Sequence, residues 1–297
     1  MTRIEQFGWR GPVEPGIGRV VSAHGDYYHL VCNEQPTGEI LARKKKSAFL
    51  RMKTAAPVNM KGKKVSEARA EGPLQPMTGD FVRFRYNAQG ESLITEVLPR
   101  FSHFERKDPT ARRTSQTLAV NFDTLFVMMS LNENFSTARL ERYLALAEDM
   151  GEAEVAVVLT KSDLVSEEDG VSSLKSQVLS CLRSFVTCPL LTISALTGDG
   201  LDRLAPYLAP GRTVAFIGSS GVGKSTLLNA LAGEEWQATQ EIQEWSGKGR
   251  HTTTSRELVM LPTGAMVIDT PGIREIGMIG EEDLLQAKGE STHRYRK

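Results

Sequence analysis

Gly218-Ser219-Ser220-Gly221-Val222-Gly223-Lys224-Ser225 matches the phosphate-loop pattern G-x-x-x-x-G-K-[ST] and is the most informative run of residues in the chain. In such a loop the glycines bring backbone N–H groups close to phosphate oxygens, and the lysine reaches the β- and γ-phosphates. The hydroxyl after the lysine binds Mg²⁺. The run therefore predicts a nucleotide phosphate site with Lys224 in a catalytic role and Ser225 as a metal ligand.

The residues on either side of this loop predict the strand and the helix that such a loop requires. Thr213–Ile217 predicts a buried strand, and Thr226–Ala232 predicts a helix that Gly233 ends. A helix that begins at the loop points the positive end of its dipole at the phosphates. We therefore expect Thr226, at the start of that helix, to belong to the binding site.

A second motif follows later in the chain, where apolar Met266-Val267-Ile268 leads into Asp269-Thr270-Pro271-Gly272. This is the pattern D-x-x-G at the end of a predicted strand. An acidic residue there can hold Mg²⁺, usually through water, and the glycine N–H can contact the γ-phosphate. Asp-Thr-Pro-Gly is also an ordinary turn sequence. Its place after a phosphate loop favours Asp269 as a Mg²⁺ residue and Gly272 as a γ-phosphate contact.

Two strands predicted before the phosphate loop end in residues suited to reading guanine. Val155–Leu159 leads into Thr160-Lys161-Ser162-Asp163, a variant of [N/T]-K-x-D, and a later apolar strand leads into Ser194-Ala195. The Asp163 carboxylate can accept two hydrogen bonds from guanine N1–H and N2–H₂, a pair of donors that adenine lacks. The Lys161 stem can lie along the base, and a backbone N–H at Ser194-Ala195 can meet guanine O6. For an isolated TKSD sequence the alternative is a helix N-cap with a charged first turn.

The order of these motifs is unusual, because the two guanine motifs precede the phosphate loop. Ordinary GTPases have the phosphate loop first, so the order here is circularly permuted. A parallel sheet tolerates this change because the ligand crevice lies at the carboxyl ends of the strands, whatever their order along the chain.

At this point the chain resembles the circularly permuted, ribosome-small-subunit-dependent GTPases of the RsgA or YjeQ type. The resemblance covers nearly the whole sequence and includes the runs Leu118–Asp123, Leu140–Ala147 and Gly249–Thr254. It implies an N-terminal OB-fold, a permuted GTPase domain and a C-terminal zinc knuckle. It also implies late maturation of the small ribosomal subunit, with GTP hydrolysis that the subunit stimulates.

Short predicted strands separated by turns make up the N-terminal part of the chain, among them residues 18–23, 27–32 and 81–86. Five such strands suit a small all-β barrel, for which the OB-fold is the natural candidate. We expect an OB-fold-like RNA-binding domain over residues 1–105 and a linker over residues 106–117. A circularly permuted α/β phosphate-loop GTPase domain with a mostly parallel sheet follows over residues 118–280, and a short basic tail over residues 281–297.

Inside the expected GTPase domain, Thr124–Ser130 predicts the opening strand. Ser136 is expected to cap a helix through Met150, with Leu140, Tyr143, Leu144 and Ala147 on its buried face.

Charge divides along the chain although the formal net charge is zero. Residues 1–115 contain 20 Lys and Arg against 12 Asp and Glu, a net charge of +8, and residues 116–297 have a net charge of −8. A basic half suggests contact with nucleic acid. The basic stretch over residues 43–64 is expected to touch phosphates of rRNA. A solvated charged loop is the alternative.

The predicted catalytic machinery lacks one common component. Ile273 follows Gly272 where many GTPases have a glutamine that orients the attacking water, and isoleucine cannot bond to water. His251 is the best substitute in the chain, and the resemblance implies the same role; a solvent-exposed histidine is the alternative. Thr253 is the expected switch threonine and Mg²⁺ ligand. Arg250 could stabilise charge or contact RNA.

The chain after Gly272 contains no cysteine and one histidine, so we expect no zinc site and only Mg²⁺ as cofactor. The three cysteines form no C-x-x-C pair, which favours a reducing, cytoplasmic location. No apolar run is long enough for a signal region or membrane span. The expected partners are GTP or GDP and the small ribosomal subunit with its rRNA, with no membrane and a monomeric chain. Two functions stay open: a subunit-stimulated GTPase, or a guanine-nucleotide-binding interaction protein with little stimulated turnover.

Overall fold

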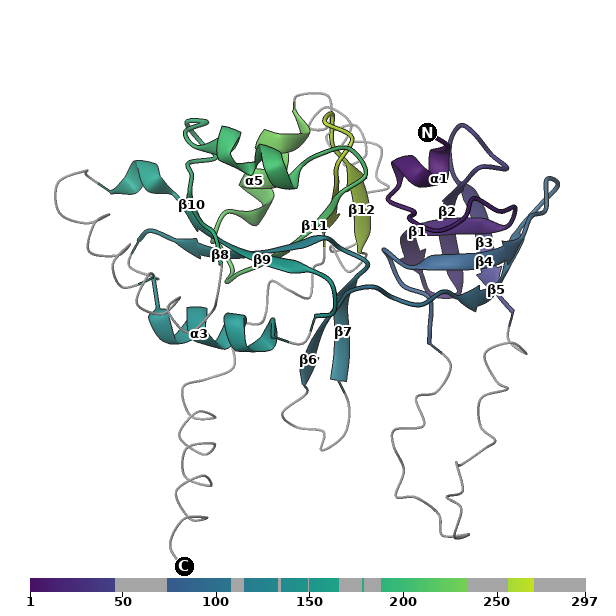
Figure 1. The fold of residues 1–297 in the computed structure, drawn as a ribbon, viewed down its shortest axis with the longest axis horizontal. Helices are drawn as coiled ribbons and strands as arrows, with labels where there is room; N and C mark the ends of the chain where they lie inside the picture. The colour runs from purple at the N-terminus through teal and green to yellow at the C-terminus, as the bar shows by residue number, and fades with distance from the viewer. Residues whose placement is uncertain are drawn as a thin grey trace, which may run out of the picture.

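The computed structural model describes residues 1–45, 74–107, 115–132, 135–148, 150–165, 178, 188–233 and 256–269. Its strands form one long sheet of order β10-β9-β8-β11-β13-β12-β1-β2-β3-β5-β4 and a separate β6-β7 pair. Figure 1 shows the barrel and the larger sheet side by side, with the N-terminus at the barrel. No helix in the described ranges is long and apolar enough to cross a membrane.

The N-terminal part is a closed five-stranded barrel, as the sequence predicts. It contains a short helix α1 (Arg3–Gln6) and five strands: β1 (Ile17–His24), β2 (Tyr27–Cys32), β3 (Ile40–Lys44), β4 (Phe81–Arg85) and β5 (Ser92–Val97). The ring closes because β1 pairs with β4 as well as β2, and β3 pairs in parallel with β5. This strand order is consistent with an OB-fold.

Alternation along the barrel strands separates its core from its surface. In β4, Phe81, Val82 and Phe84 are buried whereas Arg83 and Arg85 point to solvent. The core is filled by buried side chains from all five strands, namely Val20, Tyr28, Leu30, Cys32, Ala42, Val82, Phe84 and Ile94. Arg83 and Arg85 therefore lie on the outer face of the barrel.

The part expected to be the GTPase domain, called the GTPase part below, is a mostly parallel sheet. Its strands are β8 (Thr124–Ser130), β9 (Glu154–Thr160), β10 (Leu190–Thr192), β11 (Thr213–Ile217), β12 (Glu257–Met260) and β13 (Met266–Asp269). All neighbouring pairs are parallel except β12–β13, which form an antiparallel hairpin. The carboxyl ends of the five parallel strands therefore meet at one edge.

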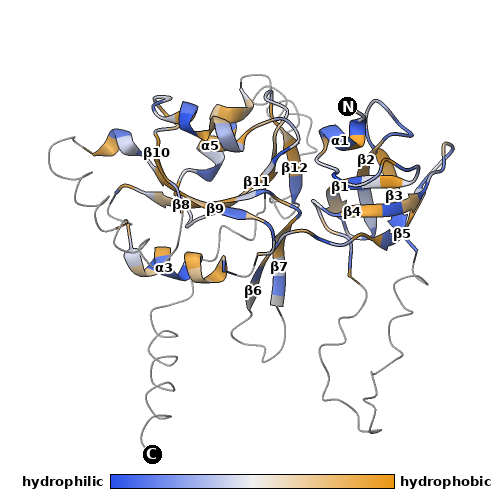
Figure 2. Ribbon diagram, in the orientation of Figure 1, coloured by the Kyte–Doolittle hydropathy of each residue, from blue (hydrophilic) through white to orange (hydrophobic). Residues whose placement is uncertain are grey.

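Helices cover both faces of this sheet, α3 (Thr137–Leu146) on one and α5 (Lys224–Ala232) on the other (Figure 1). Strand β8 is buried throughout, and its alternate residues join different cores. Leu125, Val127 and Met129 pack with α3, whereas Phe126 and Met128 pack with α5. Figure 2 shows hydrophilic and hydrophobic residues alternating along α3, as expected for a helix with one face on a sheet.

Helix α3 is shorter than the sequence predicts. Ser136 caps it through a bond from the Arg139 N–H, as expected, but the helix ends at Leu146 and not at Met150. The Met150 carbonyl instead accepts a hydrogen bond from the His103 N–H, 3.0 Å away. Pairing with a distant segment therefore replaces the last helical turn.

The expected linker region contributes a two-stranded ladder. Strand β6 (His103–Lys107) pairs antiparallel with β7 (Ser115–Val120). Buried Phe104 and Leu118 of this pair join the core that lies between the sheet and α3. The chain between the barrel and the sheet thus packs on the GTPase part. Two short 3-10 helices, η2 (Ser162–Leu164) and η3 (Leu201–Tyr207), complete the described elements.

A polar joint connects the barrel to the GTPase sheet. Arg19 of β1 is 1% exposed and donates hydrogen bonds to the Thr213 hydroxyl at 2.9 Å and the Asn121 carbonyl at 2.7 Å. It also donates to the Phe7 carbonyl at 2.6 Å. Burial lowers the pKa of the Arg19 guanidinium to about 9, while Asp123 and Asp80 act to raise it. Arg19 therefore ties the start of β11 to the barrel.

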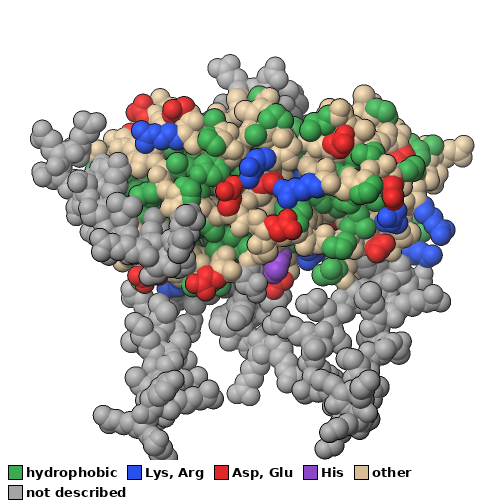
Figure 3. All heavy atoms as spheres, viewed as in Figure 1, with side chains coloured by type: hydrophobic (Ala, Val, Ile, Leu, Met, Phe, Trp, Pro, Cys, Tyr) green, Lys and Arg blue, Asp and Glu red, His purple; other side chains and the backbone are tan. Residues whose placement is uncertain are grey.

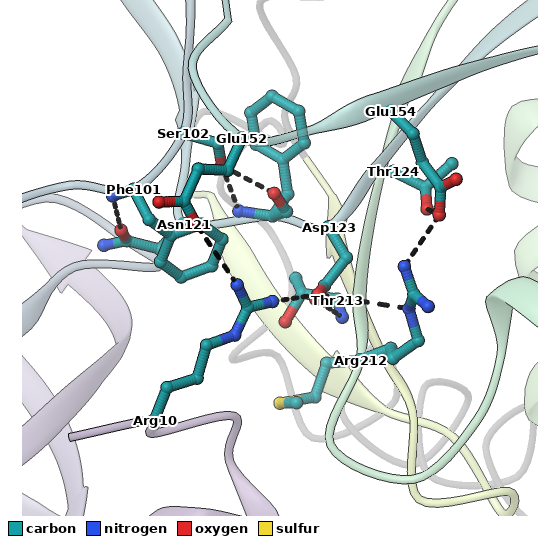
Figure 4. Close-up of polar contacts among 12 residues, drawn as sticks. Arg10, Phe101, Ser102, Asn121, Asp123, Thr124, Glu152, Glu154, Arg212 and Thr213 are labelled. Atoms are coloured by element: carbon teal, nitrogen blue, oxygen red, sulfur yellow. Dashed lines mark hydrogen bonds and ion pairs between the residues drawn. The ribbon is translucent and has the colours of Figure 1, made fainter. Parts of the chain in front are cut away.

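Asn121 and Asp123, within the run Leu118–Asp123, hold the other side of the joint (Figure 4). The Asn121 side chain accepts from the Phe101 N–H at 3.1 Å and donates to the Gly79 carbonyl at 3.2 Å. Asp123 accepts from the Thr213 N–H at 2.7 Å and pairs with Arg10. The sequence singled out this run as part of a resemblance, and the structure explains it as the connection between the two parts.

Candidate nucleotide-binding site

The phosphate loop connects β11 to α5, as the sequence predicts. Gly218 must be glycine, because a Cβ there would lie 2.8 Å from the Met128 carbonyl oxygen of β8. Gly223 has φ +104°, a conformation that other residues rarely adopt, and α5 begins at the next residue. The loop therefore turns sharply at the carboxyl edge of the sheet.

Lys224 lies folded against its own loop. Its Nζ donates to the carbonyl oxygens of Gly218 at 2.6 Å and Ser219 at 2.8 Å. A lysine ammonium has three donors, so phosphate oxygens can accept from the same group at the centre of the loop. Ser225 and Thr226 are exposed at the first turn of α5. The cation and two hydroxyl-bearing residues thus lie at the start of one helix.

Thr160 ties the first guanine motif to the phosphate loop. Its side chain is almost fully buried at the end of β9, and its hydroxyl donates to the Val222 carbonyl at 2.6 Å. Val222 is itself buried in the core beneath α5. The sequence predicted Thr160 only as a member of the guanine motif. Its contact with the phosphate loop depends on residues 62 positions apart, which sequence spacing does not reveal.

The two guanine motifs meet each other. The Ser194 hydroxyl donates to Asp163 Oδ1 at 2.5 Å, and the Ser162 N–H donates to the Ile193 carbonyl at 3.2 Å. Lys161 takes a left-handed backbone conformation with φ +60°. The Asp163 side chain is exposed, so its carboxylate is oriented by Ser194 yet open to solvent. This arrangement suits a carboxylate that accepts hydrogen bonds from two N–H donors of a base.

The second guanine motif is held by its own turn. Ser194 is fully buried and its N–H donates to the Asp199 carbonyl at 2.9 Å, while its hydroxyl accepts from the Thr197 N–H at 3.2 Å. Ala195 follows, half-buried. The sequence reasoning did not foresee the Ser194 hydroxyl as the group that orients Asp163.

The remaining predicted site residues are only partly described. Strand β13 runs parallel to β11, and its last residue is Asp269, so the backbone of Asp269 ends at the same edge as the phosphate loop. The Asp269 side chain and three other predicted residues lie outside the described part: His251, Thr253 and Gly272. The structure therefore brings the predicted base residues next to the phosphate loop, and leaves the predicted roles of Asp269, His251, Thr253 and Gly272 as predictions.

Known proteins are similar to this chain in sequence and in fold. A model of the family described as RsgA GTPase matches residues 97–279. A Lactiplantibacillus plantarum protein named small ribosomal subunit biogenesis GTPase RsgA 2 is 41% identical over 260 residues, which is 88% of this chain and 66% of that protein. A Leptospira interrogans protein named small ribosomal subunit biogenesis GTPase RsgA is 36% identical and covers 95% of this chain and 74% of its own length.

Solved structures agree with the fold. The crystal structure of YjeQ from Thermotoga maritima has a TM-score of 0.57 and 26% identity, and covers 87% of this chain and 75% of that chain. The crystal structure of YloQ, titled a circularly permuted GTPase, has a TM-score of 0.55 and 22% identity over 90% of this chain and 74% of that chain. The second supports the fold alone.

This chain spans 66%, 57% and 53% of the lengths of three of its relatives in L. plantarum, Opitutus terrae and Vibrio parahaemolyticus. It has the permuted motif order, the barrel before the sheet, and a family match over more than half of its residues. The chain belongs to the RsgA GTPase family.

Proposed function

We propose that this protein hydrolyses GTP and assists late maturation of the small (30S) ribosomal subunit, binding rRNA and changing its affinity for the subunit with its nucleotide state. The observation that carries the nucleotide part is the Thr160–Val222 hydrogen bond. It fixes the base-reading loop against the phosphate loop, although the two are permuted in the chain. The relatives' names support the ribosomal part.

Guanine is selected by Asp163 in this proposal. Ser194 holds one carboxylate oxygen, so the carboxylate plane is set before the nucleotide arrives. The pair of donors on guanine N1 and N2 then meets an oriented acceptor, whereas adenine would leave the carboxylate unpaired. Because the Ser194 N–H is bonded to Asp199, we assign the contact with guanine O6 to the Ala195 N–H. Lys161 and Ser162 complete the base side.

The phosphate side uses the loop backbone, Lys224 and Mg²⁺. The ion prefers oxygen ligands, and Ser225 at the start of α5 and Asp269 at the end of β13 offer a hydroxyl and a carboxylate at one edge of the sheet. This donor set fits Mg²⁺, and we assign the ion to Ser225, Asp269 and Thr253. When bound, it neutralises charge that develops on the phosphate oxygens. The Gly272 N–H contacts the γ-phosphate.

Hydrolysis needs a group that orients water. Ile273 cannot do this, so we assign the role to His251, beside the switch threonines in sequence. The isolated chain then turns over slowly, and binding to the subunit supplies the ordering that the chain lacks. His251→Ala should abolish stimulated turnover and leave GTP binding unchanged.

The barrel carries the proposed RNA contact. Figure 3 shows Lys and Arg side chains gathered at the outer end of the barrel. Arg43, Arg83 and Arg85 of the barrel strands are exposed, and the Arg43 guanidinium lies 4.3 Å from the centre of the exposed Tyr27 ring. Cations beside aromatic rings suit a single-stranded nucleic acid, whose phosphates and bases they bind together. The net charge of +8 over residues 1–115 supports the same assignment.

We propose the domains expected from the sequence: a barrel domain over residues 1–105, a connection over 106–117, the GTPase domain over 118–280 and a basic segment over 281–297. The first boundary falls within β6, whose Phe104 packs on the GTPase domain. We also propose a monomer in the cytoplasm, where GTP and ribosomal subunits are available.

Multiple-turnover GTP hydrolysis, measured with and without purified small ribosomal subunits, tests the proposal. We expect slow hydrolysis by the protein alone and clear stimulation by small subunits, with no stimulation by large subunits as the control. Tight GTP binding with an unchanged rate in the presence of small subunits would contradict the enzymatic proposal and favour a nucleotide-binding interaction protein.

A further inference from the structure

The barrel touches the GTPase sheet at a second place besides the Arg19 joint. Strand β1 pairs antiparallel with β12 at Ser22 and Glu257. Glu257 in turn pairs with Asp269 of β13. A row of three adjacent residues therefore runs from the barrel to the backbone of the residue proposed to hold Mg²⁺.

A buried hydroxyl strengthens this contact. Thr78 is 1% exposed, and its Oγ1 donates to the Arg256 carbonyl at 2.8 Å. The loop that carries Thr78 is bound to β1 by two backbone hydrogen bonds, from the Gly79 N–H to the Val20 carbonyl at 2.9 Å and from the Val20 N–H to the Asp80 carbonyl at 2.8 Å. The barrel thus contacts β12 at Glu257 and at Arg256, the residue just before it.

The contact between the barrel and β12 lies next to two sequence motifs. Arg256 directly follows the run that contains the threonines at 252–254, and Asp269 begins the D-x-x-G motif. Both motifs are expected to respond to the γ-phosphate. In the sequence, one motif therefore lies just before β12 and the other begins at the end of β13. Of these two strands, β12 is the one that contacts the barrel.

Val21 and Val31 of the barrel also pack in the core of the sheet, and the two polar contacts described above lie at opposite ends of its strands. Arg19 bonds to Thr213, the first residue of β11, and its Nη1 lies 3.4 Å from the sulfur of Met266, the first residue of β13. Thr78 and Ser22 contact β12 beside Asp269, the last residue of β13. Of these two polar contacts between described residues, the second lies at the nucleotide edge, where a change at the site can reach the barrel.

We propose that β12 couples the barrel to the γ-phosphate side of the site, so that GTP in place of GDP changes the affinity of the barrel for RNA. This inference rests on the proposed function. Because coupling is reciprocal, RNA on the barrel must change the relative affinity for GTP and GDP by the same factor. Thr78 is the positioning residue of this contact, and acts through Arg256 without touching the nucleotide.

Hydrogen exchange of the full chain, with Mg²⁺ and either GDP or a non-hydrolysable GTP analogue, tests the coupling without ribosomes. We expect amides of β1 and of residues 77–80 to exchange at different rates in the two nucleotide states. Thr78→Val should remove at least half of that difference, and Thr78→Ser, which keeps the hydroxyl, should retain it. The control is Thr95→Val, since Thr95 also donates to a carbonyl, that of Arg83 at 3.1 Å, but within the barrel.

A second measurement records the functional consequence. The affinity for small ribosomal subunits is compared between the GTP analogue and GDP, and coupling of ordinary strength gives a ratio of about 5-fold or more. Thr78→Val should bring that ratio towards one, while Thr95→Val leaves it unchanged.

The outcomes are distinct. Nucleotide protection of residues 218–225 with identical barrel exchange in both states would overturn the coupling and leave the proposed function intact. A Thr78→Val protein that behaves as wild type in both measurements would also overturn it. Absence of protection at residues 218–225 with either nucleotide would overturn the proposed function and this inference together.

Discussion

The barrel and the GTPase sheet are both built from buried β-strands, yet they present their functional residues differently. In the barrel, alternation puts arginines on the outer faces of strands, as in β4. In the sheet, the strands are buried on both faces, as in β8, and the functional residues follow the strand ends. The proposed RNA contact therefore lies along the side of the barrel, whereas the proposed nucleotide site lies at one edge of the parallel sheet.

The connection between the two parts differs from both interiors. The cores of the barrel and of the sheet are apolar, and Val21 and Val31 of the barrel join the core of the sheet. The polar joint beside them is formed by Arg19, Asn121, Asp123 and Thr213, all at most 9% exposed. Hydrogen bonds have fixed lengths and directions, so this joint fixes one relative orientation. The two parts should thus be coupled in stability.

The largest effect is expected for Lys224→Ala, which should abolish hydrolysis and leave the barrel folded. Lys224 donates to two carbonyl oxygens of its own loop, and its loss removes the cation at the β- and γ-phosphates. GTP turnover and the circular dichroism spectrum are the measurements. Unfolding of the whole protein would show that the two parts are not separable.

Next in size is Arg19→Met, which should lower the free energy of unfolding by about 3–5 kcal/mol, as expected when one partner of a buried charged network is removed. The loss leaves the Asn121 and Phe7 carbonyls without their charged donor. Chemical denaturation measures it. Arg85→Met, at an exposed position of the same barrel, should change stability by less than about 0.5 kcal/mol. Equal effects of both variants would show that the joint is not what couples the two parts.

Asp163→Asn should weaken GTP binding by about 2–3 kcal/mol, the value of hydrogen bonds to a charged group. It should leave the barrel and the free energy of unfolding nearly unchanged, since the Asp163 side chain is exposed. A competition titration with GTP and ATP is the measurement. Equal affinities of the wild-type protein for GTP and ATP would refute the assignment of guanine to this site.

The smallest effect should follow from neutralising the basic stretch with Lys44→Gln, Lys45→Gln and Lys46→Gln. The slope of log affinity for small subunits against log salt should become shallower by up to about 2–3 units, if each lysine contacts one phosphate. Lys44 already pairs with Asp26 at 3.3 Å, so its share should be the least.

GTP affinity of the free triple-lysine variant should not change, because the described base and phosphate residues all lie beyond residue 159. An unchanged salt slope would identify these lysines as solvated charge and move the RNA contact elsewhere.

Much of the architecture follows from local patterns. The strand Thr124–Ser130 was predicted with its observed limits, and Gly233 follows α5 as expected. These predictions succeed because strand periodicity, N-caps and glycine turns are local preferences. The helix expected through Met150 was wrong at its end, because the Met150 carbonyl bonds to His103, a residue 47 positions away that no local pattern reveals.

The sequence alone determined the motifs and their permuted order: a phosphate loop and a carboxylate suited to guanine, each written in a short run of residues. Tertiary structure decided what joins them. The Thr160–Val222 bond, the Ser194–Asp163 bond and the buried Arg19 joint connect residues 31 to 194 positions apart. Such contacts depend on which strands become neighbours in the sheet, and that is settled by packing of the whole chain and not by any local preference.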